Sequence, residues 1–76
     1  MSERITFNPQ VMGGRATIRG MRVTVSLVLS LLANRMSFAD ILEAYPYLEQ
    51  EDILACLQYA ALLANEEIRQ LNEVAA

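Results

Sequence analysis

The chain has no histidine, lysine or tryptophan and a single cysteine, Cys56, among its 76 residues. One cysteine excludes an internal disulfide, and without histidine a Cys/His metal site cannot be built. Cys56 lies among apolar residues, where cysteine is usually a small buried hydrophobic side chain. The neighbours Glu51 and Asp52 point to different faces of a helix, so we expect solvated or capping charges and no metal site. The sequence predicts no catalytic residue, no cofactor and no enzyme.

Long apolar runs are also absent, although 54% of the residues are hydrophobic. A membrane-spanning helix needs about 20 consecutive apolar residues, and the longest predicted helix is interrupted at Gln58 and Asn65. Residues 1–6 lack the apolar segment of a secretion signal, so we expect a cytoplasmic protein without a membrane span. The spacing of the glycines does not match a phosphate-binding loop, and no small-molecule substrate is expected.

The length indicates one domain that buries only about 60% of its unfolded surface, so that a monomer is marginally stable. A chain this rich in apolar residues therefore favours self-association or a partner.

Charge is divided unevenly along the chain. Residues 1–35 carry five Arg and one Glu, a balance of +4, whereas residues 36–76 carry one Arg and eight acidic residues, a balance of −7. Such a separation guides encounters with charged partners. Three arginines near the glycines are candidates for nucleic-acid contact, with solvated turn residues as the alternative: Arg15, Arg19 and Arg22.

Residues 1–24 are expected to form a short β-arm. Arg4–Phe7 is β-prone and is followed by a turn signal, and Gly14 belongs to a second turn. Arg19-Gly20 predicts a tight hairpin between the residues on either side, with Gly20 at positive φ. A two-stranded hairpin is barely stable alone, so the arm must lie on another surface.

Two short helices are predicted next. The first begins after Thr24, whose hydroxyl can cap it; it is apolar nearly all round and is expected to be the central buried helix. Asn34 suits its end because asparagine tolerates left-handed φ. The second begins at Ser37 with a pattern similar to a capping box and ends at Tyr45-Pro46, because the residue before proline is disfavoured in a helix.

The third helix begins near Glu49 or Gln50 and extends to about Asn72 or beyond, so that residues 25–64 form a three-helix core and residues 65–76 an extension. Its apolar residues form two stripes. One has the 3-4 spacing of a helix–helix seam: Leu54, Leu57, Ala61, Ala64, Ile68, Leu71 and Ala75. The other stops before Glu67: Ile53, Cys56, Ala60 and Leu63. One stripe can cover the short helices and leave the seam for a second chain, so we predict a homodimer; burial of both stripes in one core is the alternative.

The order of the second helix, a bend and the third helix is that of a helix-turn-helix. Gln50, at the start of the third helix, can then read an adenine edge. The carboxylates beside it, Glu49, Glu51 and Asp52, would be repelled by DNA. The arginines of the arm are therefore better candidates for DNA contact than this helix.

Several motifs occur in a characteristic order: Asn8-Pro9, Gly14-Arg15, Ile18-Arg19-Gly20, Arg22-Val23, Val25, Tyr45-Pro46-Tyr47-Leu48, Asp52-Ile53 and Tyr59-Ala60. Through them the chain from Ile5 to about Ala64 closely resembles the small bacterial and archaeal family labelled domain of unknown function 433. It departs from the family at Ala16 (usually Pro), Met21 (Thr), Arg35 (commonly Gly) and Glu49 (Thr or Ser).

The resemblance implies a mainly α fold, a three-helix homeodomain-like or winged helix-turn-helix bundle with a short N-terminal β-arm, usually dimeric. Members are often regarded as antitoxins of type II toxin–antitoxin pairs, which block a PIN-like ribonuclease toxin and often repress their own operon. The acidic half would then engage a basic toxin and the arm would contact DNA. A stand-alone DNA-binding regulator and an oligomerisation module with neither role are the alternatives.

Overall fold

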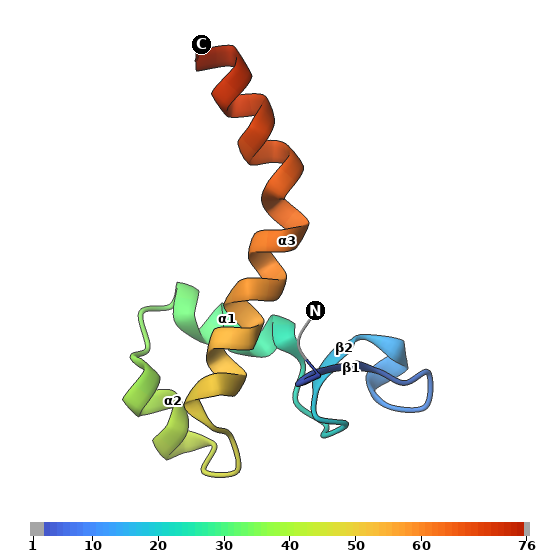
Figure 1. The fold of residues 1–76 in the computed structure, drawn as a ribbon. Helices are drawn as coiled ribbons and strands as arrows, with labels where there is room; N and C mark the ends of the chain where they lie inside the picture. The colour runs from blue at the N-terminus through green and yellow to red at the C-terminus, as the bar shows by residue number, and fades with distance from the viewer. Residues whose placement is uncertain (1–2, 76) are drawn as a thin grey trace.

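The computed structural model describes residues 3–75, and the side chains of residues 3–65. This part of the chain is mainly helical. It has an antiparallel sheet of β1 (Ile5–Phe7) and β2 (Ala16–Ile18), a 3₁₀ turn η1 (Met12–Gly14), and the helices α1 (Val25–Ala33), α2 (Phe38–Ala44) and α3 (Gln50–Ala75). The sheet, α1 and α2 surround the first half of α3, and the second half of α3 stands clear of them (Figure 1). The predicted mainly α class with a short N-terminal β segment is confirmed.

The small sheet pairs β1 with β2, with Ile5 opposite Ile18 and Phe7 opposite Ala16. The hydroxyls of the central pair, Thr6 and Thr17, lie 3.1 Å apart in hydrogen-bond contact. The β-prone run at the start of the chain is therefore a strand.

The tight turn at Arg19-Gly20 is also present. The Met21 N–H donates to the Ile18 carbonyl at 2.8 Å, and Arg19 and Gly20 have φ of 48° and 72°, the pattern of a type I′ turn. The chain after this turn contributes only one bridge, Thr17 to Thr24. The expected hairpin with residues 21–24 is thus present as a tight turn with a short pairing on the edge of β2 opposite β1, where the Ile18 N–H also donates to the Val23 carbonyl at 3.0 Å.

The hydrophobic core draws one or more residues from every strand and helix. Its fully buried members include Ile18, Val28, Ile41, Ile53 and Cys56. Because Ile5, Ile18 and Val23 belong to the same cluster, the N-terminal segment is part of the core. Cys56 is buried as expected, and burial raises the pKa of its thiol to about 11.

Helix α1 starts where the sequence predicts, because the Thr24 hydroxyl accepts a hydrogen bond from the Leu27 N–H at 3.0 Å. The prediction that α1 is the central buried helix is wrong: only Val25 and Val28 are buried, and Leu27 is 37% exposed. The centre belongs to the start of α3, which α1, α2 and β1 all contact. A nine-residue helix on one side of α3 can bury only one of its own faces.

The end of α1 is a Schellman motif. The Arg35 N–H donates to the Leu32 carbonyl and the Met36 N–H to the Leu31 carbonyl, at 3.0 and 3.1 Å. Arg35 has a φ of 70°, whereas Asn34 has a φ of −90°. The prediction of a left-handed residue at the end of α1 is correct in kind but wrong in position, because the motif places it one residue after the C-cap.

The boundaries of α2 and α3 confirm their predictions. The Ser37 hydroxyl accepts from the Asp40 N–H at 3.1 Å, and α2 ends before Tyr45. Helix α3 begins at Gln50 and continues for 26 residues. In the described part of the chain, no helix has the length and apolar character that crossing a membrane requires.

Candidate functional site

The start of α3 carries an ionic cluster around one buried carboxylate, which we define as Arg4, Arg19, Glu49 and Asp52. Asp52 is 0% exposed. Its carboxylate accepts hydrogen bonds from Arg4 Nη1 at 2.8 Å and from Arg19 Nε and Nη2 at 3.1 and 2.8 Å. It also accepts the Glu49 backbone N–H at 2.8 Å, as the third residue of a helix does in a capping box. The cluster thereby joins the N-terminal segment and the β2 turn to α3.

Hydrogen bonds favour the charged forms of Asp52, Arg4 and Arg19. Burial opposes ionisation of Asp52, but hydrogen bonds from Arg19, Arg4 and the Glu49 N–H outweigh it and hold the pKa of the carboxyl below its usual value. Hydrogen bonds from Arg4 to Glu49 and Asp52 raise the pKa of the Arg4 guanidinium, and a hydrogen bond to Asp52 raises that of Arg19. These three side chains are therefore charged at neutral pH.

The expectation of a solvated or capping charge at Asp52 is correct for the cap, since Asp52 accepts the Glu49 N–H, but wrong for the solvation, since the side chain is fully buried. The side chain lies on the covered side of α3, and two arginines distant in sequence neutralise it. Sequence reasoning missed Arg4 altogether. One local signal was available: an acid three residues after the helix N-cap often accepts the N-cap N–H, as Asp52 does for Glu49.

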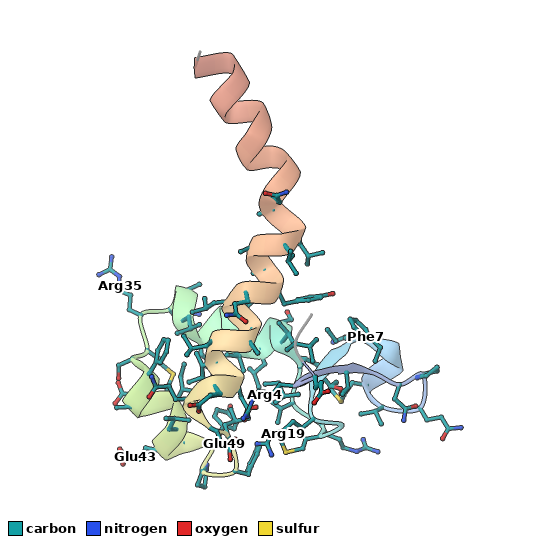
Figure 2. All side chains as sticks on the ribbon, viewed as in Figure 1. Arg4, Phe7, Arg19, Arg35, Glu43 and Glu49 are labelled. Atoms are coloured by element: carbon teal, nitrogen blue, oxygen red, sulfur yellow. The ribbon has the colours of Figure 1, made fainter. Side chains whose placement is uncertain are left out.

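The arginines proposed for nucleic acid do not act as one group. Arg19 is held by Asp52, and its Nη2 also donates to the Tyr47 carbonyl at 2.9 Å. Arg15 and Arg22 are exposed. Figure 2 shows Arg4, Arg19 and Glu49 together beside the start of α3, with Arg35 pointing away on another side of the body. Two of the three predicted arginines are thus available to a ligand.

Gln50 is exposed at the first turn of α3, as a reader of bases must be. Glu49 and Glu51 on either side are also exposed, so this helix end presents negative charge. Among the described residues, no three His, Cys, Asp or Glu side chains group in a way that could hold a metal ion.

The two apolar stripes of α3 have different environments. In the shorter stripe, Ile53 and Cys56 are fully buried, as expected for residues that cover the other helices, and Ala60 is partly buried. Leu63, at the end of this stripe, is 69% exposed, so the expected cover is confirmed only for its first part. On the predicted seam, Leu54 and Leu57 are each 40% exposed; Ala61 is exposed and Ala64 is partly buried. Ile68 and Leu71, predicted to continue the seam, lie outside the residues whose side chains are described.

The motif residues predicted to shape the chain occupy turns. Gly14 has a φ of 82°, and a Cβ at this position would lie 3.6 Å from the Pro9 Cα; its positive φ favours glycine. Tyr45 packs edge-on to Tyr47 with ring centroids 6.1 Å apart. Pro46 lies between them, in the bend that leads to α3.

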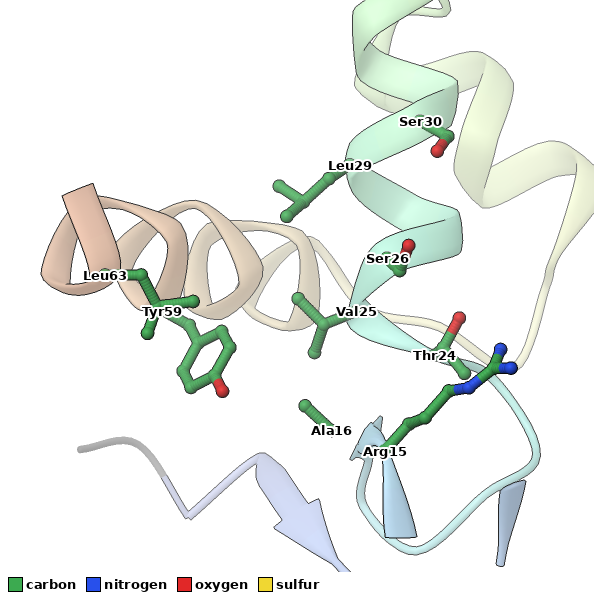
Figure 3. Close-up of a pocket in the computed structure, with 9 residues that line it drawn as sticks. All are labelled: Arg15, Ala16, Thr24, Val25, Ser26, Leu29, Ser30, Tyr59 and Leu63. Carbon is green, nitrogen blue, oxygen red and sulfur yellow. The ribbon is translucent and has the colours of Figure 1, made fainter. Parts of the chain in front are cut away.

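A pocket of about 450 Å³ lies between the end of the 3₁₀ turn, α1 and α3. Val25, Leu29, Tyr59 and Leu63 face it as an apolar wall, and Arg15 lies at its edge beside Thr24 (Figure 3). No sequence pattern predicts this pocket, because its lining residues come from three separate segments of the chain.

Comparison with known proteins places the chain among uncharacterised relatives. Residues 5–60 match the family described as "Protein of unknown function (DUF433)". A solved structure, that of a DUF433 member protein from Anabaena variabilis ATCC 29413, is similar with a TM-score of 0.74 and 29% sequence identity. That match covers 99% of this chain and 71% of the other chain. No curated protein matches the chain.

Proposed function

The chain belongs to the DUF433 family, and we propose that it is an antitoxin-type protein-binding module: a dimer that holds a PIN-like ribonuclease toxin through the seam on α3. The observation that carries this proposal is the exposure of the seam. Leu54 and Leu57 are each 40% exposed on a helix whose opposite side is packed into the core.

Exposed leucines in a row are costly for a small protein in water. Burial of a leucine side chain is worth roughly 1.5–3 kcal/mol, and contiguous apolar patches on soluble proteins typically mark interaction surfaces. Ala61 and Ala64 continue the row with small side chains, so the backbone of a partner helix can approach closely there. A partner polypeptide is the natural cover for this face.

Exposed acidic residues support a basic partner. Glu51 is exposed at the start of α3, beside Glu49, which is paired with Arg4, and Asp40 and Glu43 are exposed on α2. A surface that binds RNA is basic, so the RNA-binding face of a ribonuclease toxin has the complementary sign. Occupation of that face by an acidic protein would block access of RNA to the toxin.

The arrangement of α2, the bend at Tyr45–Leu48 and α3 follows the order of a helix-turn-helix, and we extend the proposal to a homeodomain-like or winged helix-turn-helix fold. In this fold the start of α3 would face DNA. The exposed Glu49 and Glu51 oppose that contact, so the proposal assigns α3 to the protein partner.

The test is co-expression of this chain with a PIN-like toxin encoded next to it, followed by co-purification and by rescue of the growth arrest that the toxin causes. Leu57→Glu should remain folded but lose both toxin binding and rescue. Leu27→Glu is the matched control, because Leu27 is a leucine of similar exposure, 37%, on α1. Toxin binding that is unchanged in Leu57→Glu, or absent in the unaltered chain, would overturn the proposal.

A stand-alone DNA-binding regulator is the second candidate, and one observation favours it. Arg15 and Arg22 are exposed, and within the described residues neither forms an ion pair. Two copies in a dimer would present four such guanidinium groups to phosphates. Specific binding of operator DNA without any toxin partner would favour this function over the first.

A further inference from the structure

The pocket beside α1 is an apolar surface that the chain does not fill. Its wall consists of Val25 and Leu29 from α1 with Tyr59 and Leu63 from α3. Leu63 belongs to the core-facing stripe of α3, but α1 is too short to cover it, and it is largely exposed. The pocket thus lies at the point along α3 where α1 no longer packs against it.

The edge of this pocket is positively polarised. Arg15 lies there, as does Thr24, the N-cap of α1. The first turn of α1 has no acidic residue, so its own sequence leaves the positive end of the helix dipole uncompensated. A ligand that fits must combine apolar side chains with negative charge.

The chain itself contains a segment of that description. Leu62 is 62% exposed on α3. Glu66 and Glu67 follow it in the sequence, in the second half of the helix, which stands clear of the body (Figure 1). Helix α3 has 26 residues, a length of about 39 Å at 1.5 Å per residue. It is therefore long enough to extend from one body onto another.

We propose that the pocket receives α3 from a second copy of this chain at the point where that helix leaves its own body, with Leu62 of that copy on the apolar wall and the acidic sequence that follows it toward Arg15. Each copy supplies both a pocket and a projecting helix, so a two-fold axis forms the contact twice. This inference rests on the dimer in the proposed function and assigns the dimer contact to the pocket, which leaves the seam on α3 for the toxin.

A second copy fits better than a small ligand for two reasons. The exposed Leu62 and the unfilled pocket are two apolar surfaces that a single molecule leaves in contact with water. The reciprocal contact between two copies buries both. The contact also brings Arg15, at the pocket edge of one copy, near the stretch of the other copy whose sequence contains Glu66 and Glu67. A free ligand would leave Leu62 exposed.

The variant Ser26→Glu distinguishes loss of the dimer contact from loss of folding stability. Ser26 is exposed at the pocket edge, in the first turn of α1. Glutamate there improves the helix dipole interaction, so the fold should be equally or more stable, while the added charge repels the acidic helix of the second copy. Light scattering across a dilution series should show a dimer dissociation constant raised on the order of tenfold, as for loss of about 1.4 kcal/mol. Arg22→Glu, away from the pocket, is the control and should leave the dimer unchanged.

Mixing two variants gives the decisive measurement. Arg15→Glu with Ser26→Glu makes the pocket acidic, and Glu66→Arg with Glu67→Arg makes the projecting helix basic. Each variant alone should be monomeric, whereas the mixture should form heterodimers, because both of its contacts then join opposite charges. Native mass spectrometry counts the species.

Three results would overturn the inference: a monomeric unaltered chain, a mixture that stays monomeric, or a dimer that only Leu57→Glu disrupts. The last would place the dimer contact on the seam. None of these decides whether the toxin binds, because co-purification with the toxin measures that independently.

Discussion

Asp52→Asn tests the ionic cluster with the smallest change in shape. In the structure the carboxylate accepts from Arg4, Arg19 and the Glu49 N–H while fully buried. Asparagine keeps the volume but carries no charge and has one acceptor oxygen, so it cannot satisfy all of these donors. The amide that replaces the carboxylate would then leave some of the guanidinium N–H groups without a protein acceptor.

The size of the stability loss depends on the two guanidinium groups that remain after the carboxylate is removed. Removal of one partner of a buried ion pair typically costs 3–5 kcal/mol. Because both guanidinium groups stay partly exposed, water can solvate them, and the lower end, about 3 kcal/mol, is expected. At about 4–8 °C per kcal/mol for a domain of this size, the midpoint of thermal unfolding falls by roughly 12–24 °C.

Urea denaturation followed by circular dichroism at pH 7 measures this loss, at one fixed protein concentration because dimerisation contributes to stability. Asp40→Asn is the matched control: Asp40 is exposed, lies in the first turn of α2 and should change stability by a few tenths of a kcal/mol. A loss below about 1 kcal/mol for Asp52→Asn would refute the view that this ionic cluster holds the N-terminal segment to α3.

The pH dependence gives a second readout with a definite sign. The pKa of Asp52 is lower in the folded protein than its ordinary value of 3.8, so ionised Asp52 stabilises the fold at and above neutral pH. That contribution is lost as the pH falls below about 4 and through the folded pKa. The difference in unfolding free energy between the unaltered chain and Asp52→Asn should therefore shrink below pH 4; a difference that stays constant would contradict the assignment.

Three further predictions concern other sites. Arg35→Gly should raise the free energy of unfolding by up to about 1 kcal/mol, because Arg35 has a φ of 70° that glycine adopts without strain. Asn34→Gly, at a φ of −90°, should not raise it. The urea concentrations at the midpoint of unfolding test both expectations. Cys56, whose thiol pKa is raised to about 11 by burial, should resist a thiol-reactive dye at pH 8 until the protein is unfolded; rapid labelling of the native protein would show that the side chain is accessible. If DNA binds, replacing Arg15 and Arg22 with alanine should lower the salt dependence of the affinity by about two phosphate contacts per chain. In contrast, Arg19→Ala should mainly lower stability. An unchanged salt slope in the double variant would show that neither Arg15 nor Arg22 contacts DNA.

Local chemistry determined the boundaries of the helices. The hydroxyls of Thr24 and Ser37 cap α1 and α2, and the bend at Tyr45-Pro46 separates α2 from α3, as the sequence predicts. Each of these features depends on residues within about four positions of one another. They are readable because the interacting groups are neighbours along the chain.

The roles of the charged residues needed the tertiary structure. Arg19 and Asp52 are 33 positions apart, and Arg4 and Asp52 are 48 apart, so no local pattern pairs them. Arg19 therefore looks like a ligand-binding arginine in the sequence, although its guanidinium is held by a buried carboxylate. Likewise, the two stripes of α3 are visible as spacing, but the packing of the short helices decided that Ile53 and Cys56 are covered while Leu63 of the same stripe is not.

The positions of the helices, the two apolar faces of the last helix and the family resemblance could all be predicted from the residues alone. The contact of the N-terminal segment with Asp52, the exposure of the seam and the pocket beside α1 became visible only in the folded chain. The two groups differ in range, because caps and periodicity act within one or two turns of a helix, whereas burial and ion pairing depend on which distant segments the fold brings together.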